Sequence, residues 1–288
     1  MDVFIMLLIN GLAEGALIFL MASGLSIILG LMGVVNFTHG TLFLWGGYVY
    51  IWAYNYTQSF IISVIAAMVV VFIMGAVFEK LFVSRVYGNI PAQILITLGI
   101  QVVFTDLVRL IWGATPIAVA RPDFLAGKWV FGGATIVHYR IFLIAVGLLV
   151  AIGIHLLITK TKIGMVIRAG VQRPDMVQAM GINIKMYFTF VFAGGAALAA
   201  LGGALYAPLT GSMSSAAGLN NQVLAFIVVV IGGMGSFLGS AFGSIFLGLM
   251  GALVAWFVPS LSVVANVTLM ALVLAFKPNG LFGLAVKK

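Results

Sequence analysis

Charge is scarce in this sequence, and cysteine is absent from it. Only 7% of the 288 residues are Asp, Glu, Lys or Arg, whereas a soluble domain carries about 25%. Hydrophobic residues make up 64% of the chain, which is more apolar surface than a soluble fold can hide, so we expect a protein embedded in a lipid bilayer. The lack of cysteine excludes disulfides and metal sites built from thiolates.

The sequence motifs of enzymes are also missing. His39, His138 and His155 lie far apart and lack the spacing of metal ligands. The chain has no cluster of carboxylates and no glycine-rich phosphate loop that ends in Lys followed by Ser or Thr. We therefore expect no enzyme activity, no cofactor and no metal, and ATP could drive this protein only through a partner that hydrolyses it.

Basic residues are grouped in short segments beside apolar stretches, and they account for the net charge of +8. The longest such segment, residues 160–185, carries five basic residues against a single acid, Asp175. Lysine and arginine concentrate in the cytoplasmic loops of membrane proteins. This segment is therefore a predicted cytoplasmic loop, and the basic charge gives little reason to expect nucleic acid as a partner.

Apolar stretches divide the chain into candidate membrane spans, each of which needs about 20 residues when it is a full helix. The first stretch contains acids but no basic flank, so we expect it to be a span and not a removable signal peptide. Residues 113–137 and 210–222 are predicted external loops. The candidate spans are 3–29, 41–54, 60–78, 91–112, 138–159, 186–208, 223–231, 241–257 and 263–276.

The distribution of basic residues orients these spans. Positions 80, 85, 277, 287 and 288 fall on the same side as the loop 160–185, which places the N-terminus outside the cytoplasm and the C-terminus inside it. We expect an all-α polytopic membrane protein with about eight to nine transmembrane helices, forming one domain over residues 1–288.

Glycine is abundant, and two of its clusters echo one another. Gly30 and Gly33 precede one apolar stretch much as Gly232, Gly233 and Gly235 precede another. Paired glycine-interrupted segments are typical of the broken helices of transporters, although chance is a competing explanation in a chain with 35 glycines. A third run has Gly195, Ala199 and Gly203 at a spacing of four, which predicts a helix face for close packing.

Asn36, Thr38 and His39 are polar residues within residues 15–78, where no Asp, Glu, Lys or Arg occurs. Unsatisfied polar groups cost several kcal/mol each in hydrocarbon, so these side chains should face protein or a water-filled path. One interpretation is that they cap a broken helix. The other is that they line a pathway for a solute.

Three charged residues also fall inside or near apolar stretches. Glu14 lies well within the first span, where an acid is costly and suggests a role in the pathway or a pairing with a partner subunit. It is also close enough to the N-terminus to reach the outer interface. Asp106 and Arg109 are spaced to form a local ion pair near the external face.

The loop 160–185 contains a predicted short helix that begins around Arg173, Pro174 and Asp175 and ends at Gly181. Its apolar positions include Met176 and Met180. An exposed short helix of this kind is typical of a docking element for a partner protein, whereas the positive-inside rule alone would explain the charges but not the length of the loop.

Three blocks of sequence resemble one known family. The run GLSIILGLMGVVNFTHGTLFLWGGYV (24–49), the loop QRPDMVQAMGINI (172–184) and the ending VVVIGGMGSFLGSAFGSIFLG (228–248) with FKPNGLFG (276–283) are similar to signature regions of LivH-type permeases. These are one of two membrane subunits of branched-chain amino-acid ABC importers. The blocks occur in order and span most of the chain.

The resemblance implies an inner-membrane permease with a periplasmic N-terminus that pairs with a second, LivM-like permease. It also implies two cytoplasmic ATPase subunits and a periplasmic substrate-binding protein. The coupling helix would then be residues 174–181, which transmit ATP-driven motion to the spans. The resemblance does not select the substrate, since the same family handles amino acids, amides, urea and aromatic acids.

Two other classes stay open on the residues alone. The chain could be a stand-alone secondary transporter or channel that uses Glu14 and His39 as proton-linked groups, although such carriers usually hold more ionisable groups in the membrane. A membrane-embedded transferase using His39 would lack a partner acid or nucleophile at a readable spacing. Dependence of uptake on ATP separates the importer from both.

Overall fold

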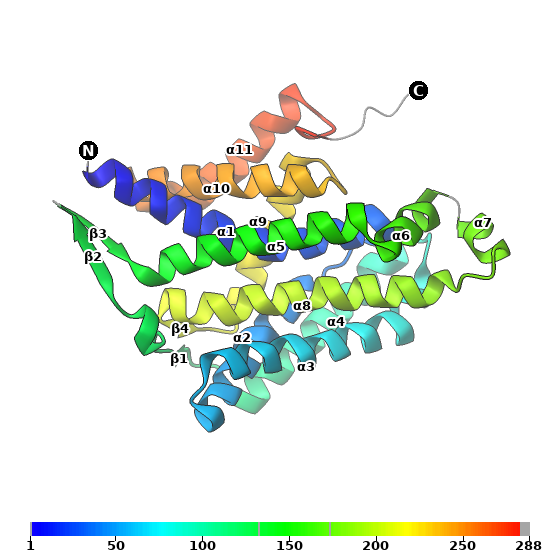
Figure 1. Cartoon of the computed structure of the whole chain (residues 1–288), viewed down its shortest axis with the longest axis horizontal. Coiled ribbons are helices and arrows are strands. Elements are labelled where there is room, and N and C mark those ends of the chain that lie inside the picture. The colour runs from blue at the N-terminus through cyan, green and yellow to red at the C-terminus, as the bar shows by residue number, and fades with distance from the viewer. Residues whose placement is uncertain (1, 132, 173, 283–288) are drawn as a thin grey trace.

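The computed structural model describes residues 2–131, 133–172 and 174–282, and most of its α-helices run along one long axis (Figure 1). Long apolar stretches form helices here because a helix satisfies its own backbone hydrogen bonds without water. The helices are α1 (Asp2–Met32), α2 (His39–Thr57), α3 (Phe60–Leu81), α4 (Ile90–Trp112), α5 (His138–Lys160), α6 (Lys162–Gln172), α7 (Pro174–Ala179), α8 (Ile184–Thr210), α9 (Ala217–Gly232), α10 (Phe237–Phe257) and α11 (Ser262–Phe276).

Short strands and 3-10 helices occupy the connections. β1 (Ile117–Ala118) pairs with β4 (Ser212–Met213), and β2 (Lys128–Phe131) pairs with β3 (Ala134–Val137), both antiparallel. The 3-10 helices are η1 (Val83–Val86), η2 (Asp123–Leu125) and η3 (Pro259–Leu261). The labelled strands lie at one end of the long axis, called the strand end here, and α6 and α7 lie at the other, called the α6–α7 end (Figure 1).

Within the described residues, 6 helices are long and apolar enough to cross a membrane. They are α1, α3 continued through η1, α4, α5, α8 and α10. Two more apolar helices, α9 and most of α11, are shorter. The expectation of an all-α polytopic membrane protein is therefore confirmed at this level.

The predicted spans agree closely with the helices, but three connections differ from expectation. The second predicted external loop, 210–222, is wrong in part because α9 already begins at Ala217. Its polar residues suggested a loop, yet Asn221 and Gln222 are buried, and the Asn221 amide donates to the Ala217 carbonyl within the helix. The loop 160–185 holds two helices, α6 and α7, where one was expected, and the loop 113–137 contains β1, η2 and the hairpin of β2 and β3.

Helix α8 lies at the centre of the packing, against α1, α2 and α3. The predicted small-residue face of this helix makes the contact. A Cβ atom on Gly203 would lie only 1.9 Å from the carbonyl oxygen of Phe43 in α2, and Ala199 is fully buried. Close packing of backbones through small residues is confirmed for this helix.

The two glycine-rich breaks meet in space. A Cβ atom on Gly30, near the end of α1, would lie 2.4 Å from the Cα atom of Gly235, which precedes α10. Gly235 has a φ of 83°, a conformation that side-chain-bearing residues seldom adopt. The echo seen in the sequence thus corresponds to two breaks that lie against each other.

Candidate functional site

Helix α2 begins in the interior of the molecule, after a break in which the chain turns back from the end of α1. The Nε2 atom of His39 donates to the carbonyl oxygen of Met21, at 2.9 Å. Met21 lies about three turns before the end of α1, so the start of α2 lies beside the middle of α1 and not at its end. Asn36, Thr38 and His39 are each fully buried. The structure therefore brings these three predicted residues together inside the protein.

The side chain of Asn36 supports the break locally. Its Oδ1 atom accepts from the backbone N–H of Thr38 at 3.0 Å and from the Thr38 hydroxyl. Asn36 thus accepts from a backbone N–H of the break, as one interpretation expected, but Thr38, the N-cap residue of α2, makes no capping bond with its side chain. Asn36 Nδ2 and His39 Nδ1 are buried and have no hydrogen-bond partner among the described residues, so the same cluster also offers polar atoms that the protein leaves unused.

Two glutamines from other helices hold the backbone of the break. Gln93 of α4 accepts from the Val35 N–H at 3.2 Å, and Gln222 of α9 accepts from the Gly40 N–H at 3.2 Å. Both side chains are almost fully buried. Sequence reasoning missed them because it searched for charge, but an uncharged polar residue inside an apolar span was a usable signal.

Glu14 lies apart from this cluster. It is exposed on α1, and Arg140 at the start of α5 is near enough for the two charges to interact. The structure thus places a basic group of the same chain near this acid, in addition to any that a partner would supply.

The loop element at the α6–α7 end presents methionines outward. Met176 is 62% exposed and Met180 77% exposed, while Val177 between them is buried. The short helix is stopped at Gly181, whose φ is 81°. Arg173 and the side chains of Pro174 and Asp175 lie outside what the structure describes.

A chain of hydrogen bonds connects the start of α8, which follows α7, with the helix break. Glu79 of α3, only 2% exposed, accepts from the Thr189 hydroxyl of α8 at 2.5 Å and from the Tyr87 hydroxyl. Burial, together with the bond to Glu79, raises the pKa of Tyr87, so its hydroxyl stays protonated and donates. The predicted span 60–78 ends just before Glu79, and nothing in the sequence indicated that this acid is buried.

Gln93 completes this chain. Its Nε2 atom donates to the carbonyl oxygen of Val86, the neighbour of Tyr87, at 3.3 Å, while its Oε1 atom accepts from Val35 in the break. Hydrogen bonds therefore join α8 to Glu79 and Tyr87, the backbone continues from Tyr87 to Val86, and Gln93 then links Val86 to the residues that lead into α2.

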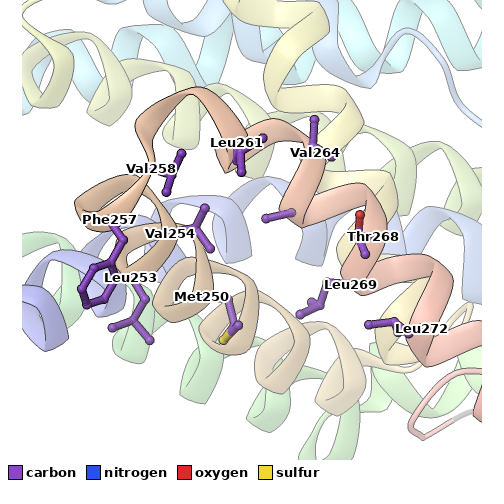
Figure 2. A pocket seen from close by; sticks show the side chains of 11 residues that line it. Met250, Leu253, Val254, Phe257, Val258, Leu261, Val264, Thr268, Leu269 and Leu272 are labelled. Atoms are coloured by element: carbon purple, nitrogen blue, oxygen red, sulfur yellow. The ribbon is translucent and has the colours of Figure 1, made fainter.

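Two hollows in the surface are apolar. One, of about 530 Å³, lies between α10 and α11, and Thr268 is the polar side chain among those that line it (Figure 2). The other, of about 640 Å³, lies between α1, α3, α5, α6 and α8. Neither gathers groups that would orient a charged solute, and both suit lipid tails or apolar packing.

Comparison with known proteins gives matches along almost the whole chain. Residues 7–276 match the family described as branched-chain amino acid transport system, permease component. The branched-chain amino acid permease BraD of Pseudomonas aeruginosa is 29% identical, and the alignment covers 96% of this chain and 94% of that protein.

Permeases of two other organisms are similar over the same length. The high-affinity branched-chain amino acid permease LivH of Escherichia coli is 26% identical, with coverage of 97% and 96% of the two chains. A probable branched-chain amino acid permease LivH of Methanocaldococcus jannaschii is 26% identical, with coverage of 96% and 93%. No solved structure gives a significant match.

Proposed function

We propose a function from the premise that this chain belongs to the family of permease components of branched-chain amino acid transport systems. It is a multi-pass inner-membrane protein and a transport subunit, not an enzyme. We infer that it forms, with a second LivM-like permease, the path of an ATP-driven ABC importer for a branched-chain or related hydrophobic amino acid. The near full-length similarity to permeases whose names state this transport carries the proposal.

The remaining partners follow from the same premise. Two cytoplasmic ATPase subunits supply the energy, and a periplasmic binding protein delivers the solute. We place the α6–α7 end in the cytoplasm, since the basic loop 160–185 lies there, and the strand end with the N-terminus and the loop 113–137 in the periplasm. In this arrangement residues 1–288 form a single permease domain of about eight to nine membrane-embedded helices.

Coupling between ATP hydrolysis and transport begins at α7. The exposed Met176 and Met180, with Arg173, Pro174, Asp175 and Gly181 around them, form the surface that an ATPase subunit grips. When the ATPase subunit moves α7, the displacement passes to α8 and then, through Glu79, Tyr87 and Gln93, to the helix break. The break then opens or closes the path beside Asn36, Thr38 and His39, while Glu14 faces the path or the second permease.

Purification of the tagged protein from its native membrane in mild detergent tests the proposal. A second permease and two ATPase subunits should accompany it in a stable ratio, and the complex in liposomes should take up leucine only with ATP and the binding protein. The alternative is a stand-alone secondary transporter or channel. A chain that comes out alone, with uptake driven by a proton gradient and indifferent to ATP, would replace the importer with that alternative.

A further inference from the structure

Polar side chains recur at every fourth residue along α4, which is otherwise apolar. The set consists of Gln93, Thr97, Gln101, Thr105 and Arg109. Four residues turn a helix by about 400°, so each member is displaced by about 40° from the one before and the set forms a slowly winding line. Uncharged polar and charged side chains inside a membrane are costly, and a continuous line of them calls for a function.

The polar line is confined to one side of α4. Other positions on this helix carry large apolar side chains that are exposed in the isolated chain. They include Leu95 at 73% exposure, Val102 at 61% and Leu110 at 80%. Because these apolar groups suit lipid, the helix has one face for the membrane and another, polar face for something else.

Exposure falls along the polar line from the strand end toward the α6–α7 end. The side chain of Arg109 is 49% exposed and that of its ion-pair partner Asp106 56%, whereas Gln101 and Thr105 are half-buried and Thr97 is fully buried. Gln93, the last member, is closed off by its bond to the helix break at Val35. The line is thus open on the side that we place in the periplasm and shut at the break.

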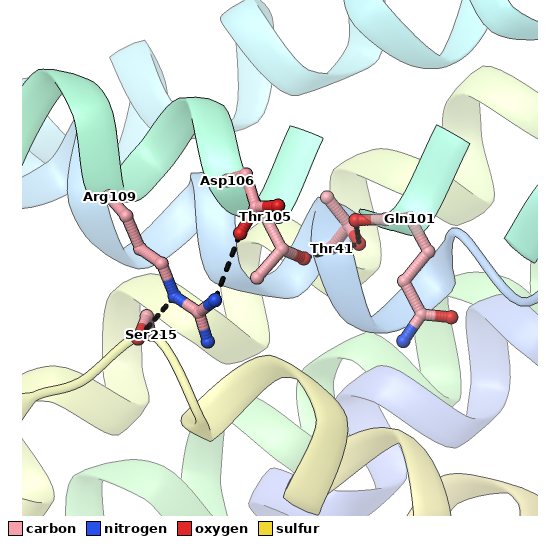
Figure 3. Close-up of polar contacts among 6 residues, drawn as sticks. All are labelled: Thr41, Gln101, Thr105, Asp106, Arg109 and Ser215. Carbon is pink, nitrogen blue, oxygen red and sulfur yellow. Dashed lines mark hydrogen bonds and ion pairs between the residues drawn. The ribbon is translucent and has the colours of Figure 1, made fainter. Parts of the chain in front are cut away.

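Side chains of other elements contact the polar line (Figure 3). The Thr41 hydroxyl of α2 lies 3.4 Å from the Thr105 hydroxyl and 3.5 Å from the carbonyl oxygen of Gln101. Ser215, just before α9, accepts from Arg109 Nε at 3.2 Å. Gln101 Oε1 is buried and has no hydrogen-bond partner among the described residues, so one acceptor of the line is unused.

We propose that the polar line of α4, together with Thr41, forms one wall of the solute path, and that Asp106 and Arg109 at its open end receive the ammonium and the carboxylate of a zwitterionic amino acid. This rests on the proposed transport function. The two side chains now bind each other at 2.9 Å. A half-exposed ion pair is weak, so a zwitterion can exchange partners with it, carboxylate to guanidinium and ammonium to carboxylate.

The absence of cysteine allows a direct test of the path. Gln101→Cys and Thr105→Cys are made singly, with Leu95→Cys and Val102→Cys on the apolar face as matched controls, and each is assembled with its partner subunits. A charged, membrane-impermeant methanethiosulfonate reagent is added, and labelling is read on this chain after separation. The two polar-line variants should react at least about tenfold faster than the controls, because charged reagents enter only wet surfaces.

Equal labelling of the polar-line and control variants, whether fast or slow, would overturn the path. Leucine with the binding protein should also slow the labelling of Thr105→Cys, and a rate that leucine leaves unchanged would overturn contact between the solute and this wall. The labelling contrast depends on water access and not on transport, so it stands or falls separately from the importer, whereas protection by leucine rests on the proposed function.

The zwitterion contact is tested by uptake. Arg109→Gln should lower leucine uptake about tenfold, the loss expected for one charge-assisted hydrogen bond, while the complex still assembles. Lys128→Gln, a neutralisation at the same end, is the control. Wild-type uptake in Arg109→Gln would overturn the contact. If the wild-type complex imported no amino acid, both the proposed zwitterion contact and the proposed importer function would be wrong. The labelling result would still show whether the polar line of α4 is a wet wall of a path.

Discussion

Uncharged amide side chains, rather than charged ones, hold the broken backbone of this protein. Gln93 and Gln222 each accept from a backbone N–H that the break leaves without a helical partner. An unpaired N–H in this apolar interior would cost several kcal/mol. A charged acceptor would pair with the N–H, but the free energy lost on burying its charge would exceed the gain from the hydrogen bond. A neutral amide meets the need with the smallest penalty.

The sequence alone pointed to only part of this cluster. Asn36, Thr38 and His39 stood out because they are adjacent to one another in a stretch without charge. Their partners could not be found in the same way, since Gln93 is separated from Val35 by 58 positions and Gln222 from Gly40 by 182. Local patterns reveal the break, whereas the groups that stabilise it come from the fold.

A single methyl group at Gly203 should disrupt the centre of the molecule. A Cβ atom there would lie 1.9 Å from Phe43 O, so Gly203→Ala must push α8 and α2 apart and is expected to cost about 1–3 kcal/mol. Folded yield and the melting temperature in detergent should both fall. Gly194→Ala on the same helix, where a Cβ meets nothing within 4 Å, is the control. Equal melting of the two variants would contradict this prediction.

At the scale of elements, Glu79 joins α3, α8 and the segment before α4. Glu79→Gln replaces one accepting oxygen by an amide nitrogen that cannot accept, so the bond from Thr189 or from Tyr87 is lost. We expect the complex to assemble and hydrolyse ATP but to move fewer solute molecules per ATP, by about tenfold for one lost hydrogen bond to a charged group.

The measurement is the ratio of leucine taken up to ATP hydrolysed in liposomes. Lys80→Gln, an exposed change at the neighbouring position, serves as the control and should keep the ratio of the unaltered protein. An unaltered ratio in Glu79→Gln as well would show that the hydrogen-bond chain plays no part in coupling.

Helix α7 should provide much of the affinity for the ATPase subunits. The double change Met176→Ala and Met180→Ala removes two exposed apolar side chains, and we expect the affinity of the ATPase subunits to fall about tenfold or more while the protein still inserts. Binding is measured by pull-down from detergent. Met234→Ala, equally exposed on the turn between α9 and α10, is the control. A similar loss of ATPase affinity in both variants would show that α7 has no special role in docking.

Elements with strong apolar patterns were predictable, and so was the short helix α7, but α6 in the same loop was not. The predicted spans 91–112 and 138–159 agree with α4 and α5 within a residue, because membrane helices must be long and apolar. Helix α6 was missed since its residues are mostly polar or small. It is held by Ile167 and by Gly170, which packs against Ile184, and these contacts depend on the fold around it.

At the scale of the whole molecule, the two breaks lie against each other through Gly30 and Gly235. The sequence suggested that both breaks exist, since glycine clusters mark them. It could not show that they touch, because their contact requires α1 and α10 to pack antiparallel along their lengths. The meeting of distant segments is a property of the assembled fold.

The orientation of the molecule can be checked with the same cysteine-free background. Lys128→Cys lies in the hairpin at the strand end and Lys162→Cys in α6 at the opposite end. In intact cells an impermeant thiol reagent should label the first and not the second, because the basic loop is retained in the cytoplasm. Opening the cells should expose both. The reverse pattern would invert the proposed topology.

The packing of α1 also sets the order in which the molecule can be completed. The most extensive neighbour of this first helix is α10, which is synthesised near the end of the chain. At about 5–20 residues per second, ribosomes need on the order of tens of seconds to reach it. During that interval the glycine face of α1 that later receives α10 is available to other proteins in the membrane. During synthesis, α1 therefore stays without its main packing partner until α10, in the last third of the chain, has been inserted.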